Sequence, residues 1–137
     1  GIAESLKHKV GSAFTFDKEP QVTVTGRDLV EGVPRQVLLE ASDVRDAIDN
    51  VVREIVDAIR ICLAKTPPAL AAVIDKEGAW LAGGGSLLKQ FDRRIAEDLG
   101  IPVNRTEDPL STVVLGSGLC LERFSNYRKI LKQSSRQ

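Results

Sequence analysis

Three consecutive glycines followed by a serine, Gly83-Gly84-Gly85-Ser86, form the stretch of this 137-residue sequence best suited to binding chemistry. The apolar run 79–82 precedes them and a segment of helical periodicity, 86–99, follows them, so the glycines join a predicted buried strand to a helix. Residues without side chains let a ligand approach the backbone closely and tolerate positive φ angles. A helix beginning at Ser86 would direct free amides and the positive end of its dipole toward a phosphate or ribose.

A tight strand-to-helix turn without a ligand accounts for three glycines equally well. Two familiar phosphate-binding loops are excluded. A dinucleotide-binding loop requires a third glycine at the position of Leu88, and a Walker loop requires Gly-Lys followed by Ser or Thr, whereas Lys89 follows Leu88 and precedes Gln90. The glycine run therefore indicates a nucleotide without identifying it.

The other polar residues form no persuasive catalytic or metal-binding group, so we predict neither in this chain. The single histidine, His8, lies among lysines on a polar helix face. The carboxylate pairs at 97–98 and 107–108 are adjacent in sequence and occur at predicted helix ends, where capping explains them. Cys62 and Cys120 lack metal-ligand spacing and are expected to pack as small apolar side chains in a reducing cytosol, although one disulfide is an alternative.

The composition is that of a globular domain. Nineteen basic residues balance nineteen acidic ones, so the net charge attracts neither nucleic acid nor an anionic membrane. No apolar stretch approaches the roughly 18 residues of a membrane span. Only the tail, 123–136, is locally basic, and we interpret it as a solvated helix end and a frayed terminus. Because the sequence starts within a helical pattern and contains no methionine, we expect it to be a piece of a longer protein.

Hydrophobic periodicity predicts the elements that position these residues. Apolar residues at a spacing of four predict a helix over 2–10 that ends at Gly11. Alternating valine and threonine at 22–25, and a second apolar run at 37–39, predict a two-stranded hairpin within a small β-rich insertion, 12–41. The loop between the strands should contain Gly26, Gly32 and Pro34.

A long helix capped by Ser42 is predicted next, with Asp43 and Asp46 favourable at its positive end. One buried stripe should run along it, formed by Val44, Ile48, Val51, Val52, Ile55, Ile59 and Cys62. Thr66-Pro67-Pro68 ends this helix, and Pro68 can begin a short helix that extends through Ile74.

The remaining segments predict a strand at 79–82, a helix at 86–99 closed by a left-handed Gly100, and a strand at 101–103. Asp108 as the cap and Pro109 at the first helical position should begin a last helix. Helices and strands that alternate in this way predict an α/β layered domain.

Separated motifs of this sequence resemble the MreB family of bacterial actins. They follow one another in the family's order over positions 1 to about 124: Ala3-Glu4-Ser5-Leu6-Lys7, Val10-Gly11-Ser12-Ala13, Gly26-Arg27-Asp28-Leu29, Gly32-Val33-Pro34-Arg35, Thr66-Pro67-Pro68-Ala69-Leu70, Leu81-Ala82-Gly83-Gly84-Gly85-Ser86-Leu87-Leu88 and Glu107-Asp108-Pro109-Leu110 with Gly116 and Gly118. The resemblance implies an α/β fold, domain II of an actin-like ATPase of the ribonuclease H-like class. Residues 1–11 and 42–137 would form subdomain IIA, and residues 12–41 the β-rich inserted subdomain IIB.

The resemblance also implies a binding site for ATP with Mg²⁺ between two domains. Glu4 and Lys7 would lie beside the ribose and adenine, and Asp108-Pro109 would begin the helix that closes the adenine pocket. The adenosine loop would consist of Gly83, Gly84, Gly85 and Ser86, with Leu87 close to the base. Glu4 and Lys7 are three residues apart and share a helix face, so an ordinary surface ion pair is the alternative.

Members of this family are ATPases that polymerise into membrane-associated filaments and guide cell-wall synthesis in rod-shaped bacteria. The resemblance therefore implies a cytoplasmic protein whose partners are further copies of itself and proteins of cell-wall synthesis and membrane morphogenesis. The phosphate-binding hairpins, the catalytic acid, most of the magnesium site and the membrane element should lie in another part of the protein. This chain alone should then neither hydrolyse ATP nor bind a membrane.

Two alternatives remain open. The first is a different ATPase of the same superfamily, a sugar kinase or a heat-shock chaperone, because these proteins share the adenosine loop. The compact insertion at 12–41 and the Thr66-Pro67-Pro68 motif favour the filament-forming family over them. The second is an interaction domain without a nucleotide, in which the glycines only turn the chain.

Overall fold

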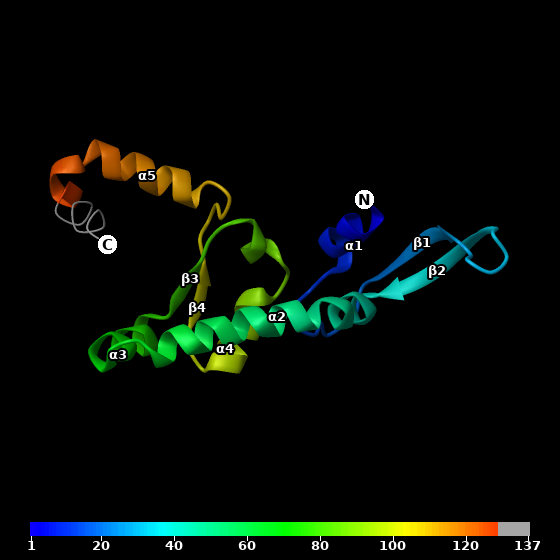
Figure 1. The fold of residues 1–137 in the computed structure, drawn as a ribbon, viewed down its shortest axis with the longest axis horizontal. Helices are drawn as coiled ribbons and strands as arrows, with labels where there is room; N and C mark the ends of the chain where they lie inside the picture. The colour runs from blue at the N-terminus through cyan, green and yellow to red at the C-terminus, as the bar shows by residue number, and fades with distance from the viewer. Residues whose placement is uncertain (129–137) are drawn as a thin grey trace.

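The computed structural model describes residues 1–128 of the chain, and the predicted basic tail beyond residue 128 lies outside the described residues. The molecule is elongated (Figure 1): a β-hairpin projects at one end, and the last helix lies toward the other. None of the helices formed by residues 1–128 combines the length and the apolar character of a bilayer-spanning segment.

The first helix and the hairpin form as predicted. Helix α1 spans Ile2–Val10, and strand β1, Gln21–Arg27, pairs in antiparallel register with β2, Pro34–Glu40. The turn is shorter than expected. Gly26 and Pro34 belong to the strands, and only Gly32 lies in the turn, at a φ of 70°. Pro34 is tolerated because it is the first residue of its strand.

The long helix α2, Ala41–Ala64, follows β2 directly, and the predicted cap at Ser42 is wrong. Glu40, the last residue of β2, occupies the N-cap position, and its backbone amide donates to the carboxylate of Asp43 at 2.8 Å. Ser42 lies inside the first turn. The helix starts two residues earlier than its sequence indicated because the strand leads into it without a loop.

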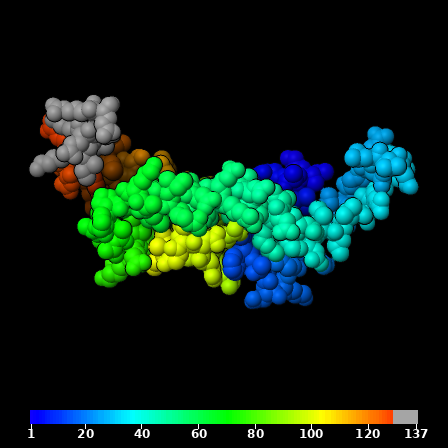
Figure 2. All heavy atoms as spheres, turned by 60° about the horizontal axis from the view of Figure 1, so that its bottom comes forward, coloured from blue at the N-terminus to red at the C-terminus, as the bar shows by residue number. Residues whose placement is uncertain are grey.

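The core lies along one face of α2. Five buried side chains form it: Ala13, Val52, Val56, Phe91 and Ile95. Phe91 and Ile95 belong to helix α4, Phe91–Leu99, which lies against α2 in Figure 2. Ile48 and Ile59 pack against this cluster as predicted, but the single buried stripe was wrong.

The predicted stripe along α2 divides into two faces. Val56, which the prediction omitted, is buried, whereas Val51 and Ile55 are 59% and 42% exposed and Cys62 is also exposed. Residues of the described chain cover only one side of α2, so the second apolar face remains open. Cys62 and Cys120 are both free, which leaves the disulfide alternative unsupported.

Two short parallel strands form the second sheet. Helix α3, Pro68–Glu77, leads through Gly78 into β3, Ala79–Leu81, which pairs with β4, Val103–Arg105. Strand β4 begins two residues later than predicted. Gly100 ends α4 in the left-handed conformation, as expected, at a φ of 69°. The expected burial of β3 is wrong for Trp80, whose side chain is 67% exposed.

The last helix, α5, spans Thr112–Glu122 and starts later than predicted. Asp108 and Pro109 form a turn before it: the amide of Ser111 donates to Asp108 Oδ1 at 3.3 Å, and the amide of Thr112 donates to the Asp108 carbonyl at 3.0 Å. Asp108 therefore caps this turn, and Ser111 takes the N-cap position of the helix. No residue of α5 is buried.

Candidate functional site

The glycine turn, residues 83–87, follows the carboxyl end of β3. Gly83 adopts a φ of 82°, which a residue with a side chain rarely adopts, and its amide donates to the carbonyl of Pro109 at 2.7 Å. Gly84–Leu87 then form a short 3₁₀ helix, η1. The segment before α5 thus fixes the start of the glycine turn.

Ser86 stabilises this turn from inside. Its side chain is buried, and its hydroxyl donates to the carbonyl of Gly83 at 2.7 Å, while its amide donates to the same oxygen at 3.1 Å. The hydroxyl is therefore engaged in shaping the backbone. In this structure Ser86 therefore shapes the turn.

The predicted helix from Ser86 to Leu99 is wrong, because the chain leaves the helix between η1 and α4. Lys89 forms an isolated parallel bridge with Ser12, and its carbonyl accepts the amide of Ala13 at 2.9 Å. Gln90 then adopts a left-handed conformation with a φ of 57°, and α4 begins at Phe91. A contact with the distant amino-terminal segment overrides the local helical pattern. No α-helical dipole is therefore centred on Ser86.

The glycines of the turn have open space beside them. A Cβ atom at Gly85 would meet nothing within 4 Å, and one at Gly84 would lie 3.5 Å from Leu110 Cδ2, an ordinary contact distance. Both residues are exposed, and neither has a positive φ. Within the turn, only Gly83 needs to be glycine for the fold, because of its positive φ and not because of packing. Beside this space Leu87 presents an apolar side chain that is 46% exposed.

Glu4 and Lys7 lie together on the exposed surface of α1. Glu4 Oε1 is 2.7 Å from Lys7 Nζ and 3.0 Å from His8 Nε2. The hydrogen bond from Lys7 is the main cause that lowers the pKa of Glu4 from its ordinary value. Glu4 is therefore an ionised hydrogen-bond acceptor at neutral pH, beside a positive charge.

Glu4 and Lys7 on α1, named here the α1 pair, are connected to the glycine turn through Lys9 and Lys89, which were not among the predicted site residues. Lys89 Nζ donates to the carbonyl of Lys9 at 2.5 Å, which joins the last turn of α1 to the segment after η1. In the view of Figure 1, α1 and the turn after β3 both lie above α2. Among residues 1–128, no hydrogen bond or ion pair joins Glu4 or Lys7 directly to the glycine turn.

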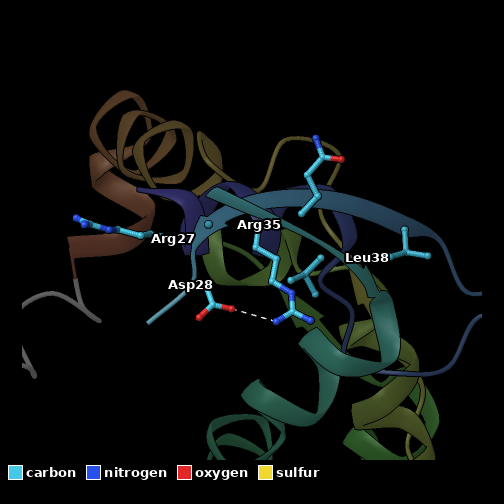
Figure 3. Close-up of a pocket in the computed structure, with 7 residues that line it drawn as sticks. Arg27, Asp28, Arg35 and Leu38 are labelled. Carbon is cyan, nitrogen blue, oxygen red and sulfur yellow. Dashed lines mark hydrogen bonds and ion pairs between the residues drawn. The ribbon is translucent and has the colours of Figure 1, made fainter. Parts of the chain in front are cut away.

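Two hollows lie elsewhere on the surface. One, of about 490 Å³, lies on the hairpin, where Arg35 Nη1 contacts Asp28 Oδ2 at 3.0 Å (Figure 3). The other, of about 240 Å³, lies between α1 and β1. Neither includes the glycine turn, which forms an open surface. Within the described part of the chain, no group of three His, Cys, Asp or Glu side chains is arranged to hold a metal ion.

Comparison with known proteins places these features in context. The family model described as MreB/Mbl protein matches residues 1–129. The chain is 42% identical over 120 residues to the cell shape-determining protein MreB of Escherichia coli K12, covering 88% of this chain and 35% of that protein. It is 35% identical over 127 residues to the cell shape-determining protein Mbl of Bacillus subtilis strain 168, covering 93% of this chain and 38% of that protein.

Solved structures give the same result. The crystal structure of MreB5 of Spiroplasma citri bound to ADP is similar to this chain with a TM-score of 0.79 and 26% identity, over 98% of this chain and 39% of that one. The same protein bound to AMPPNP also has a TM-score of 0.79, over 95% and 38%. The chain thus spans little more than a third of the length of the proteins it matches.

Proposed function

Because the chain belongs to the MreB/Mbl family, we propose that it supplies the adenosine side of an ATP site in a filament-forming bacterial actin. The expected α/β fold of an actin-like ATPase is confirmed by the similarity to MreB5. The domain assignment stays part of the proposal: residues 1–11 and 42–137 form subdomain IIA, and residues 12–41 form subdomain IIB.

One observation carries the proposal: hydrogen bonds hold the glycine turn at Gly83 and Ser86, while the space beside Gly84 and Gly85 stays open. Gly83 is fixed by Pro109, and Ser86 closes the turn from within. Nothing in the described chain's own packing requires the two following glycines. A flat adenosine that rests on the backbone would require them, since any side chain would occupy its place. ADP and AMPPNP, bound by the similar MreB5 structures, share that adenosine.

The α1 pair supplies complementary chemistry. The ionised carboxylate of Glu4 accepts hydrogen bonds from ribose hydroxyls, and the stem of Lys7 lies against the base while its ammonium group stays in water. Leu87 contributes an apolar contact. Nucleotide binding must then compete with the existing contact between Glu4 and Lys7, which costs little because water screens an exposed ion pair.

Phosphate chemistry belongs to another part of the protein in this proposal. Magnesium is held mainly there, and positioning of phosphates, metal and attacking water is the principal requirement for hydrolysis. We propose filaments made of copies of the complete protein, located in the cytoplasm and attached to the membrane through that other part. Proteins of cell-wall synthesis and membrane morphogenesis are the proposed partners, in line with the cell shape-determining relatives.

The site assignment is tested by Gly84→Arg in the complete protein. The arginine side chain would fill the adenosine space without straining the backbone, because Gly84 does not have a positive φ. We expect the affinity for ATP to fall at least about tenfold, a loss of roughly 1.4 kcal/mol. Isothermal titration with ATP measures it.

Gly26→Arg is the matched control, because Gly26 lies on the hairpin, has no positive φ, and a Cβ there would meet nothing within 4 Å. It should bind ATP like the unmodified protein. Unchanged ATP affinity in a folded Gly84→Arg variant would show that the glycine turn is not the adenosine site.

A further inference from the structure

The two sides of the proposed site come from opposite parts of the sequence, and a small set of contacts joins them. The backbone segment Ser12–Phe14 and the residues Lys89 and Arg94 make these contacts, and we name them together the clasp. The segment follows directly after α1, which carries Glu4. Lys89 lies two residues after the glycine turn, and Arg94 lies on α4.

The backbone part of the clasp is buried. Ser12 and Ala13 are 0% and 1% exposed, so their polar groups depend on protein partners. The amide of Ala13 donates to the carbonyl of Lys89, and Lys89 Nζ donates to the carbonyl of Lys9. Lys89 therefore contacts both the last turn of α1 and the segment that follows it. A shift of Lys89 would move α1 and the glycine turn relative to each other.

Within the clasp, Arg94 links the segment Ser12–Phe14 to helices α2 and α4. Its Nη1 donates to the carbonyl of Ala13 at 3.2 Å and to Asp49 Oδ1 on α2 at 2.9 Å, while its Nε contacts Asp98 Oδ2 on α4 at 2.6 Å. The side chain is 16% exposed, and the hydrogen bond to Asp98 is the main cause that raises the pKa of Arg94. One planar cation thus connects the amino-terminal segment with two helices.

The contacts at the end of α1 also affect the position of Glu4, because Glu4 lies further along the same helix. Glu4 lies seven residues before Gly11, so a rise of 1.5 Å per residue places it about 10 Å from the end of the helix. The chain passes so close to α1 at Gly11 that a Cβ there would lie 2.3 Å from the Lys7 carbonyl. A small rotation of α1 at the clasp therefore becomes a larger displacement at Glu4.

We propose that Arg94 is a positioning residue for the nucleotide, which sets the distance between the Glu4 carboxylate and the glycine turn by holding the segment Ser12–Phe14. This inference rests on the proposed function. It assigns a role in ribose recognition to a side chain that belongs to the packing between α4, α2 and the amino-terminal segment.

The test compares ATP with 2′-deoxy-ATP and 3′-deoxy-ATP in the complete protein. A hydrogen bond from ribose to the Glu4 carboxylate should favour ATP on the order of tenfold. Arg94→Ala should remove most of this preference while affinity for the deoxy nucleotides changes little, and Glu4→Gln should give the same result. General destabilisation would instead weaken all three nucleotides equally and leave the preference unchanged.

Arg53→Ala is the matched control. Arg53 pairs with the same Asp49 at 2.7 Å, but its side chain is 66% exposed and lies on α2 itself. This variant should keep the full preference for ATP. Arg94→Lys guards against misfolding, since lysine keeps the positive charge but cannot bond three acceptors with one planar group, and it should lose part of the preference.

The outcomes separate this inference from the proposed function. If Glu4→Gln removes the ribose preference but folded Arg94→Ala or Arg94→Lys retains all of it, the inference is wrong and the proposed function stands. If the unmodified protein does not bind ATP, both are wrong.

Discussion

Two glycines near the proposed site are required for different physical reasons. Gly11 has ordinary backbone angles, a φ of −63° and a ψ of 135°, but the Lys7 carbonyl occupies the place where a Cβ would project. Gly84 has neither a special conformation nor a crowded environment. The first glycine is needed by the fold, and we attribute the second to a ligand. Stability and binding measurements can therefore distinguish them.

Gly11→Ala should destabilise the protein, because its Cβ would lie within 2.3 Å of a backbone oxygen that cannot rotate away. Overpacking of this kind costs about 1–3 kcal/mol. We expect a lower thermal unfolding midpoint, measured by circular dichroism on the complete protein. Gly26→Ala, where the space is open, should leave the midpoint unchanged or raise it slightly. Equal midpoints for the two variants would contradict the close contact.

At this scale the sequence predicted the residues with a local signal and missed those whose partners are distant. The glycine turn was recognisable from composition, whereas Glu4 and Lys7 entered the predicted site through the family resemblance, since their spacing alone indicates only a surface ion pair. Lys89 and Arg94 carried no such signal, because a lysine and an arginine in a helical pattern normally face solvent. Their partners, Lys9 and Ala13, are 80 and 81 positions away. Only the tertiary structure brings them together.

Among the elements, the hairpin turn is stabilised by interactions of one carboxylate, Asp28, with residues of the same hairpin. Asp28 Oδ1 accepts the amides of Val30 at 2.8 Å and Glu31 at 3.1 Å, and its Oδ2 contacts Arg35. The backbone amide of Glu31 is the main cause that lowers the pKa of Asp28 from its ordinary value of 3.8, followed by the amide of Val30 and the side chain of Arg35. The ionised carboxylate therefore orders the turn.

The pH dependence of this turn follows from the sign of that shift. A lowered pKa in the folded state means that Asp28 contributes fully to stability above pH 3.8, and that the contribution disappears as pH falls through the lower, folded pKa. Titration of the Val30 and Glu31 amide signals by NMR should give a midpoint below 3.8. Asp28→Asn keeps an acceptor oxygen but does not titrate. The same midpoint in that variant would contradict the assignment.

Elements with strong local signals, such as α1, the hairpin and α3, were predicted from sequence. Element boundaries failed where another segment intervened. The helix expected from Ser86 is divided by the pairing of Lys89 with Ser12, and α2 starts earlier because Glu40 passes directly from strand to helix. The buried stripe of α2 was predicted too broadly, since periodicity identifies apolar faces but not whether a partner covers each of them.

At the scale of the whole molecule, large apolar side chains are exposed on α5 and on one face of α2. Such exposure is expected if this chain is only part of a protein as long as its relatives. Helix α5 has apolar side chains on all sides, including Val113, Leu115 and Leu121 at 69%, 61% and 74% exposure, and a helix of this kind is normally buried. The chain covers 35% of the E. coli relative. We expect the rest of the protein to cover α5 and the open face of α2.

The proposed assembly is tested by sedimentation of the complete protein with and without ATP. The protein should pellet with ATP and remain soluble without it, and Gly84→Arg should stay in the supernatant under both conditions. A sugar kinase or a chaperone would bind ATP without pelleting. That result would refute the filament while leaving the nucleotide site intact.

The clasp also has a consequence for the order in which the protein forms during synthesis. The hairpin strands are neighbours in sequence and can pair as soon as residue 40 has left the ribosome. Helix α1 is synthesised before the hairpin, but its contact from Lys9 to Lys89 forms only after 80 further residues have been added. Contacts of such long separation form slowly because loop closure must precede them. The nascent chain would therefore complete the proposed adenosine site only after most of the described residues have been translated.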